Sequence, residues 1–326
     1  MLRVGWKTKA AIQGTLALLP RGKDWNQAIQ RHLTKSLVLD REKFLTKLEF
    51  ARVHVRNLAE LEGVTKDFSV LEVGTGRFPI VPLYMFLRGA GQVVSLDIIC
   101  LLRADTIRDT LRFYQAELKA GRIPEVLPER AACLLEVIHT STPATTPQLL
   151  REFNIVTELC DARQTALPKH SFDLLVSNTT LEHIPGPILV EILRHWRELA
   201  CPNAVMSHFI DMRDHYAEWD RSITVYNFLR YSKRRWRWFN NSLLYQNRLR
   251  ISDYRRIHAD AGWEIVFEQA DPGWQDDLAT IPLAEEFRDY SRDDLQVPTC
   301  WMVSRTGQKD LGAGAALRVF DEQVAR

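Results

Sequence analysis

The chain has 326 residues, of which 46% are hydrophobic and 26% charged, with a formal net charge of +2 at pH 7. This length allows one enlarged domain, or one domain with a sizeable subdomain, and the composition is ordinary for a soluble globular protein. The small net charge does not by itself suggest nucleic acid or membrane as a partner. The five cysteines are widely spaced and include no Cys-x-x-Cys pair. They argue against a disulfide framework or a structural zinc site and favour a reducing cytoplasm.

The first 66 residues are expected to form a helical extension ahead of the main domain. Apolar residues recur at three- and four-residue spacings in residues 25–35 and 41–61, and Asp40 is placed to cap the second helix. Residues 10–19 form an apolar run that loosely resembles a signal peptide. A glutamine interrupts this run and no small-x-small cleavage site follows it, so we expect a short amphipathic helix packed over the ligand-binding cleft. The alternative is attachment to a membrane surface.

The main domain begins with a short apolar run, Ser69-Val-Leu-Glu-Val-Gly-Thr-Gly76, that ends in an acid and two spaced glycines. The run does not alternate with polar residues, as expected of a parallel strand buried on both faces. Gly74 and Gly76 provide a tight turn at which a ligand can approach the backbone, and a helix should follow. A dinucleotide-binding turn needs a small residue three positions later, where this chain has Pro79. Glu72 favours a ligand with an ammonium group, because a carboxylate at the strand end repels a pyrophosphate.

The later strands follow the order of an open α/β sheet. The second strand ends at Asp97, about 25 residues past Glu72, which is close to the spacing of a ribose-binding carboxylate. The third leads into Asp161, and the fourth into Thr179-Thr-Leu-Glu-His-Ile184. The expected strands cover residues 70–73, 93–97, 156–159, 172–178, 204–210, 263–268 and 300–304.

The connection between the second and third strands, residues 100–154, is unusually long and is expected to be a helical insertion that ends in a loop over 140–147. A later helix should be capped by Ser252 and ended by Gly262. The expected helices of the domain cover residues 107–118, 129–138, 187–199 and 252–262.

Two motifs carry a family resemblance. Glu72-Val-Gly-Thr-Gly76 resembles motif I of class I S-adenosylmethionine (SAM)-dependent methyltransferases. Leu-Pro before a strand that starts with Phe-Asp, followed by Leu181-Glu-His-Ile184, resembles the small-molecule members of that family. The resemblance implies a doubly wound α/β fold: a mostly parallel seven-stranded sheet with helices on both faces and an antiparallel last strand. To this the chain adds the N-terminal helical extension and a helical lid after the fifth strand.

We therefore divide the chain into a helical extension (1–66), a methyltransferase domain (67–305) and a tail (306–326). Within the domain, residues 100–154 are the helical insertion and residues 211–250 the basic aromatic lid.

In open α/β sheets, ligands bind beyond the carboxyl ends of the strands, where the strand order reverses. The resemblance implies that the first turn holds the methionine portion of SAM, that the acid after the second strand accepts the ribose hydroxyls, and that later strand ends meet the adenine and the sulfonium. For Asp97 and Asp161 the alternative role is a helix cap or a residue of a solvated turn. The expected SAM-binding residues are Glu72, Gly74, Gly76, Asp97, Ile98, Asp161, Ala162 and Asn178.

Methyl transfer from a sulfonium is an in-line displacement, which needs a positioned acceptor and, for a hydroxyl, a group that removes its proton. His215 and Asp211 lie just after the fifth strand and are candidates for a base and the residue that orients it. His183, after the fourth strand, is the third candidate. The alternatives are structural, because His183 could bond only backbone and Asp214 could cap a helix.

Carboxylates and imidazoles at the same mouth could also hold a divalent ion. Metal-assisted catechol-type methyltransferases, however, use acids after the fourth strand as well as the fifth. Here the fourth strand leads into Ser177-Asn-Thr-Thr180, with no acid until Glu182. We therefore expect no metal.

Residues 222–252 contain no acidic residue and interleave arginines with aromatic residues. Such a surface suits sugar faces, flat rings and phosphates, and also nucleic acid or an anionic membrane. The alternative is a helical lid whose aromatic residues pack on the core while its arginines face water or pair with the acids of residues 271–294.

The sequence thus favours a SAM-dependent methyltransferase with a small or medium-sized acceptor, expected to be a hydroxyl and to be anionic or saccharide-containing. A nucleic-acid methyltransferase is the alternative within the class, although the Asn/Asp-Pro-Pro-aromatic motif of amino-methylating enzymes is missing. A second alternative is a SAM-binding regulatory or scaffold protein that has lost catalysis.

Overall fold

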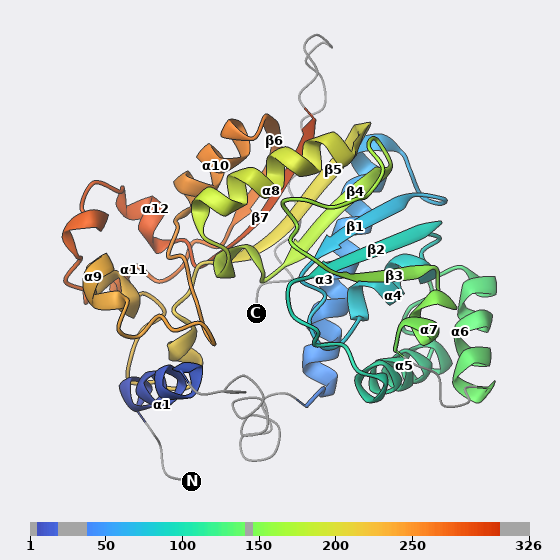
Figure 1. Cartoon of the computed structure of the whole chain (residues 1–326), viewed down its shortest axis with the longest axis horizontal. Helices are drawn as coiled ribbons and strands as arrows, with labels where there is room; N and C mark the ends of the chain where they lie inside the picture. The colour runs from blue at the N-terminus through green and yellow to red at the C-terminus, as the bar shows by residue number, and fades with distance from the viewer. Residues whose placement is uncertain (1–4, 19–37, 141–145, 307–326) are drawn as a thin grey trace.

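The computed structural model describes residues 5–18, 38–140 and 146–306. At its centre is a seven-stranded sheet in the order β3-β2-β1-β4-β5-β7-β6 (Figure 1). The strands from β3 to β5 pair in parallel, whereas β7 lies antiparallel between β5 and β6. The strand order reverses between β1 and β4, which places the turns after these strands at one edge. The bounds are β1 Ser69–Val73, β2 Gln92–Asp97, β3 Ile155–Leu159, β4 Phe172–Asn178, β5 Ala200–Asp211, β6 Trp263–Ala270 and β7 Thr299–Thr306.

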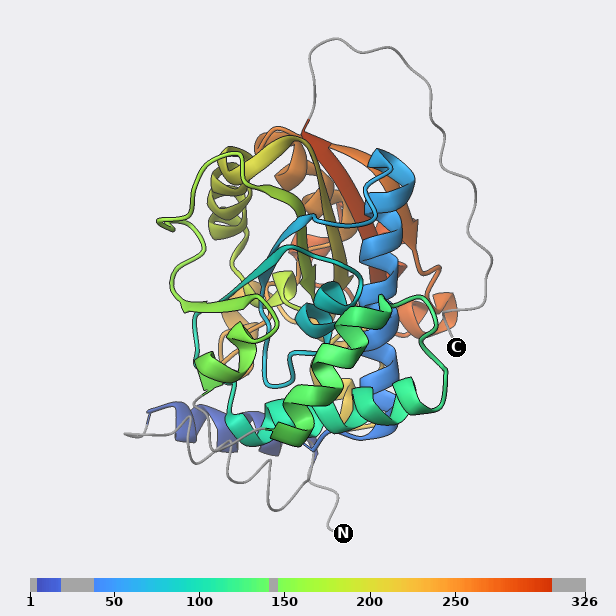
Figure 2. The same ribbon diagram turned by 90° about the vertical axis from the view of Figure 1, so that its right-hand side faces the viewer.

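Helices cover both faces of the sheet, as Figure 2 shows. Val70 of β1 points into a core shared with α3 and α4, and Leu71 points into a second core shared with α8 and α10. Because both faces of β1 are covered, its residues are apolar without alternation. The expected fold class, a doubly wound and mostly parallel seven-stranded sheet, is confirmed. These helices are α3 Arg41–Glu62, α4 Ile80–Leu87, α8 Gly186–Leu199 and α10 Ile251–Asp260.

The connection between β2 and β3 contains three helices, α5 (Ala104–Lys119), α6 (Pro128–Thr140) and α7 (Thr146–Arg151). The expected loop over 140–147 is wrong at both of its ends, because α6 runs to Thr140 and α7 begins at Thr146. A proline in the first turn is compatible with a helix, and two leucines of α7 are buried against the core.

The helix ends differ in how well the sequence indicated them. Asp40 caps α3 as expected, since its carboxylate accepts a hydrogen bond from the Lys43 N–H at 2.9 Å. The expected cap at Ser252 is wrong, because α10 starts after Arg250, whose N–H is bonded by the Asp253 carboxylate at 2.9 Å, and the Ser252 hydroxyl donates to Asp294. The helix expected over 25–35 and the tail from residue 307 lie outside the described residues.

The N-terminal helix α1 (Trp6–Leu18) packs on the lid, and not over the ligand-binding cleft as expected. The Trp6 ring lies 4.8 Å from that of Phe239 and 5.5 Å from that of Tyr216, and the backbone N–H of Trp6 donates to the Asp220 carboxylate at 2.9 Å. Across the described ranges, the structure contains no helix that combines the length and the apolar character needed to cross a membrane.

The lid consists of short helical turns rather than one longer helix. Local side-chain bonds to the backbone favour such turns. Asp214 accepts from the Tyr216 N–H at 2.9 Å, and Ser232 accepts from the Arg235 N–H at 3.4 Å. The short elements are η2 His215–Glu218, η3 Asn227–Arg230 and α9 Lys233–Trp236 in the lid, and α11 Gln275–Ala279, η4 Glu285–Phe287 and α12 Arg292–Gln296 after β6.

Candidate functional site

The glycine turn after β1 is packed against the turn after β4. Gly74 has a φ of +83°, and a Cβ atom at this position would overlap the side chain of Thr180. Gly76 has a φ of +70°, but its position faces open space within 4 Å. The first glycine therefore permits a contact between two loops, while the second leaves room for a ligand beside the backbone.

Glu72 is buried at the carboxyl end of β1 and is held by two hydroxyl groups. Its Oε2 accepts hydrogen bonds from Ser95 at 2.8 Å and from Thr75 at 3.0 Å. Burial raises the pKa of Glu72, although these two donors act in the opposite direction. The carboxylate is thus fixed in position beside the glycine turn.

A cavity of about 390 Å³ opens beside this turn, between the ends of β2 and β3. Asp97 lies in its wall and joins two loops, because its carboxylate accepts from the N–H groups of Gly76 (3.2 Å) and Ile99 (3.0 Å). Ile98 is 74% exposed, and its neighbour Ile99 lines the cavity instead. The volume of this cavity is in the range of small-molecule and cofactor sites. The other lining residues are Thr75, Ser95, Cys100, Leu101, Leu102, Thr146, Pro147, Thr157, Glu158 and Leu159.

Asp161 and Ala162 follow β3, next to this cavity but not in its wall. The Asp161 carboxylate forms an ion pair with the Arg163 guanidinium at 2.6 Å, which holds the pKa of Asp161 below its usual range. Ala162 is buried in the core on the α8 side of the sheet. Neither side chain is directed to the cavity wall in the way that the resemblance implies.

Asn178, at the end of β4, is oriented by α3. His54 on α3 donates from Nε2 to Asn178 Oδ1 at 3.0 Å, and its Nδ1 lies 2.8 Å from Ser207 Oγ. Asn57, one turn further along α3, also bonds Ser207 at 3.0 Å. The Asn178 Nδ2 is buried and has no hydrogen-bond partner among the described residues, so this donor is available to a ligand.

Lys47 on α3 interacts electrostatically both with Glu72, beside the glycine turn after β1, and with Glu182, in the turn after β4. Burial lowers the pKa of Lys47, while the carboxylates of Glu72 and Glu182 both act to raise it. The ammonium group is therefore within electrostatic reach of both carboxylates. Sequence analysis missed Lys47, although a signal exists. Lys47, His54 and Asn57 occupy the apolar face of α3 at three- and seven-residue spacings, where a polar side chain needs a buried partner.

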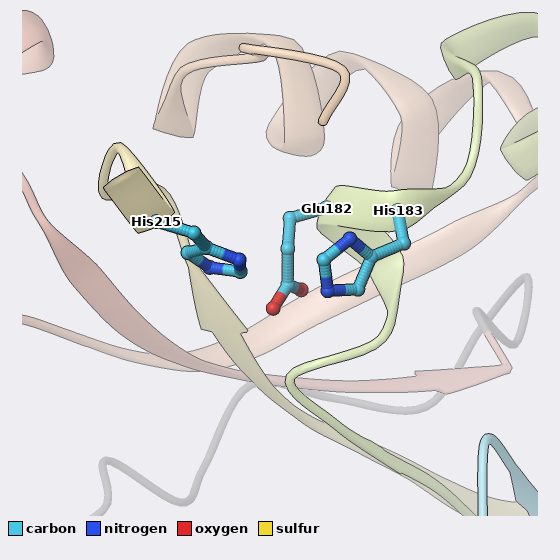
Figure 3. A group of neighbouring side chains, drawn as sticks. All are labelled: Glu182, His183 and His215. Carbon is cyan, nitrogen blue, oxygen red and sulfur yellow. The ribbon is translucent and has the colours of Figure 1, made fainter. Parts of the chain in front are cut away.

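Three of the polar residues after β4 and β5 converge in Figure 3, where the Glu182 carboxylate lies between the imidazole rings of His183 and His215. The two ring centroids are 5.1 Å apart, and one potential ligand atom from each of the three residues lies within 4.8 Å of the other two. The structure thus brings together the two candidate catalytic histidines. It adds Glu182, which sequence analysis did not name as a candidate metal ligand.

Asp211 is engaged mainly by Arg213 and not by His215. Its carboxylate accepts from Arg213 Nη2 at 2.6 Å and Nε at 2.9 Å, whereas His215 Nε2 is 3.7 Å away, too far for a hydrogen bond. Burial alone would raise the pKa of Asp211, but Arg213 and His215 outweigh it and lower the pKa below its usual range. Asp211 is therefore a poor proton acceptor, and Asp214 is a cap for η2.

Residues 245–247 of the lid hold the loops that carry these groups. The Tyr245 carbonyl accepts from His183 Nδ1 at 2.7 Å, and Asn247 donates to the Glu182 carbonyl at 2.8 Å. Gln246 accepts from the His215 N–H at 3.1 Å. The lid therefore fixes the positions of Glu182, His183 and His215 from one side.

Much of the basic aromatic lid has a structural role. Arg248 bonds Glu286 at 2.7 Å, and Arg250 is fully buried with hydrogen bonds to three backbone carbonyls. Trp236 is buried in a core with Trp6 and other lid residues. The outer residues differ, because Trp238 is 83% exposed. Arg234, Arg235 and Arg237 are exposed beside it.

No protein-family model matches the chain, and no curated protein matches it in sequence. Among solved structures, a SAM-dependent methyltransferase from Mesorhizobium loti is 14% identical over 77% of this chain and 96% of its own length, with a TM-score of 0.41. One from Methanosarcina mazei is 12% identical over 74% and 94%, with a TM-score of 0.38. Geranyl diphosphate C-methyltransferase from Streptomyces coelicolor, solved with Mg²⁺, geranyl-S-thiolodiphosphate and S-adenosyl-L-homocysteine, is 10% identical over 78% and 76%, with a TM-score of 0.42.

Proposed function

We propose that this protein is an enzyme that binds SAM and transfers its methyl group to a hydroxyl of a small or medium-sized acceptor. The observation that carries the proposal is the position of Glu72 and Asp97, which flank the glycine turn at the edge where the strand order reverses. This edge is where open α/β sheets bind ligands. The cavity beside Asp97 supplies the space that the adenosine portion needs.

The residues of the pocket fit SAM in charge and in hydrogen bonding. Glu72 would pair with the ammonium of the methionine portion, and Lys47 with its carboxylate. Asp97 would accept the ribose hydroxyls, and Ile99 would take the place of Ile98 against the adenine. The open side of Gly76 would let the ligand approach the backbone. Asp161 and Ala162 would serve the pocket only through the backbone of their loop.

The acceptor would bind beside the Asn178 amide, next to Glu182, His183 and His215. Bound SAM supplies an electrophilic methyl group, and the chain's own residues must position the acceptor and receive its proton. His215 is the preferred acceptor of that proton, because Asp211 is occupied by Arg213. His183, whose Nδ1 is bonded by the Tyr245 carbonyl, would help to place the acceptor.

The exposed arginines of the lid, with Trp238, support an acceptor that is anionic or saccharide-containing. A peripheral contact with an anionic membrane rests on the same residues. We propose no nucleic-acid partner. All five cysteines are free, in keeping with the reducing cytoplasm that we propose as the compartment.

Mass spectrometry of the purified protein tests this function, followed by assays that measure S-adenosylhomocysteine released with candidate acceptors. The expected result is bound SAM or S-adenosylhomocysteine and turnover with a hydroxylated acceptor. SAM binding without product from any acceptor would support the inactive regulatory or scaffold protein instead.

A further inference from the structure

We infer that Glu182, His183 and His215 form a binding site for a divalent first-row transition-metal cation. The site lies beside the acceptor region, at the ends of the loops that follow β4 and β5 (Figure 3). It replaces the expectation of no metal, which assumed that an acid must directly follow the fourth strand.

Glu182 is the observation that points to a ligand. The Glu182 side chain lies between the two imidazoles, and Glu182 is only 2% exposed. Neither of its carboxylate oxygens has a hydrogen-bond partner among the described residues. Burying an unpartnered carboxylate is costly, so buried carboxylates are normally paired or coordinate a metal. A cation held by Glu182 would satisfy both oxygens.

Both histidines are prepared as ligands. His183 is bonded through Nδ1 to the Tyr245 carbonyl at 2.7 Å, which places a proton on Nδ1 and leaves the Nε2 lone pair for a cation. Such a bond from the second ring nitrogen is the usual way in which proteins orient a metal-binding imidazole. The Nε2 of His215 is buried and has no hydrogen-bond partner in the part of the chain that the structure describes.

The surrounding charges can accommodate a cation. Asp211 adds a second carboxylate, 3.7 Å from His215 Nε2, and Arg213 neutralises it. The Lys47 ammonium also interacts electrostatically with Glu182. A divalent cation at the site would give the Glu182 oxygens, which have no hydrogen-bond partner among the described residues, a coordination partner.

Two imidazole nitrogens with one carboxylate favour Mn²⁺ or Zn²⁺ over Mg²⁺ and Ca²⁺, which prefer oxygen ligands. Ligand atoms about 2.1 Å from one zinc ion lie roughly 3.4 Å from one another in a tetrahedral site. Separations of up to 4.8 Å would therefore close by up to about 1.4 Å, through rotation of the Glu182 and histidine side chains.

The consequence for catalysis rests on the proposed function. A cation at this site would hold an oxygen of the acceptor and favour its deprotonated form, as a Lewis acid does. His215 would then act as a ligand in place of the base role proposed above, and the proton of the acceptor hydroxyl would pass to water.

The experiment uses the full chain, stripped of metal with a chelator and titrated with Mn²⁺ or Zn²⁺ by calorimetry. We expect one cation per chain, with affinity lowered at least roughly tenfold in Glu182→Gln and in His215→Gln. His195→Ala is the matched control, because this histidine on α8 bonds Thr165 and should not affect cation affinity. Glu182→Gln preserves the shape of the side chain, so it decides the question even if His215→Gln does not fold.

Thermal unfolding provides a second readout. Without metal, Glu182→Gln should melt no lower than wild type, because the buried oxygens of Glu182 have no hydrogen bond to lose among the described residues. With Mn²⁺ or Zn²⁺, the melting temperature of wild type should rise and that of the variant should stay constant. The inference is overturned if neither ion binds wild type, or if both variants bind as tightly as wild type. SAM binding by metal-free protein is measured separately, so that loss of cation binding alone contradicts this inference, and loss of SAM binding alone contradicts the proposed function.

Discussion

Gly74 and Thr180 are packed so closely that a single carbon atom added to the glycine would overlap the threonine side chain. This contact joins the turn after β1, next to Glu72, to the turn after β4 that carries Glu182 and His183. The proposed SAM pocket and the proposed acceptor region are therefore held together by direct packing between loops.

The contact predicts different costs for alanine at the two glycines of the turn. Gly76→Ala should lower the free energy of unfolding by about 1–2 kcal/mol, the cost of a left-handed backbone for a residue with a Cβ. Gly74→Ala should lower it further, because strain and overlap add. Thr180→Ala in the Gly74→Ala background should recover part of the loss. Urea denaturation of the four proteins, wild type included, measures these differences, and equal losses at Gly74 and Gly76 would contradict the packing.

Replacing His215 should lower turnover much more than it lowers the affinity for SAM. His215→Ala is expected to reduce kcat by roughly a hundredfold or more while leaving SAM affinity nearly unchanged, since its proposed work is on the acceptor. Asp211→Asn should also reduce kcat, because it releases Arg213 beside the site. Steady-state kinetics with calorimetry of SAM binding separates the two effects. If both variants keep full activity, the proton is removed elsewhere, and His183 is the next candidate.

Two tryptophans of the lid, Trp236 and Trp238, should respond differently to replacement. Trp236 is buried against the rings of Phe228, Tyr231 and Phe239, so Trp236→Ala should lower the free energy of unfolding by about 3–5 kcal/mol. Trp238 is 83% exposed, so Trp238→Ala should leave stability unchanged and weaken acceptor binding if it stacks on the acceptor.

The dependence of acceptor binding on ionic strength tests whether the exposed arginines next to Trp238 contact the acceptor. Replacing Arg234, Arg235 and Arg237 by Gln should weaken binding of an anionic acceptor and flatten its dependence on ionic strength, because exposed charge contacts are screened by salt. Identical acceptor affinity at every salt concentration would assign the whole lid to structure.

Acid should destabilise the protein through its buried histidines, among them His54 and His258. Burial lowers the pKa of His54 and of His258 from 6.5 to about 4. As pH falls from about 6.5 to about 4, the unfolded chain takes up protons that the folded chain does not, so stability is lost within this window. Each histidine contributes a slope of up to about 1.4 kcal/mol per pH unit. His258→Phe should reduce the slope by one histidine's share, measured by urea denaturation across this pH range. An unchanged slope would mean that His258 is not held neutral.

The elements that sequence analysis predicted correctly are those whose pattern follows from burial on both faces. The run 70–73 and the acids Glu72 and Asp97 stand where a parallel sheet ends, and they depend little on distant parts of the chain. Ile99 lines the cavity where the sequence suggested Ile98, because adjacent residues point in different directions and only the path of the loop decides which one faces the cavity.

The acceptor side was harder to predict, because it depends on contacts between segments far apart in the sequence. Glu182 faces His215 because residues 245–247 of the lid fix both loops. Lys47 reaches the site because α3 packs on β4 and β5, as the contacts of His54 with Asn178 and Ser207 show. No local sequence motif predicts either arrangement, although a lysine on the apolar face of a helix indicates a buried polar partner.

The most direct test of the central claim is calorimetric titration of the protein with SAM. Wild type should bind SAM, and Asp97→Ala should bind it roughly 10- to 100-fold more weakly, the loss expected for hydrogen bonds to a charged group. Asp109→Ala is the matched control, because this aspartate on α5 pairs only with the exposed Arg112 in the described contacts, and it should bind as wild type does. Absence of SAM binding to wild type, or equal stabilisation of wild type and Asp97→Ala by NAD, would contradict the account.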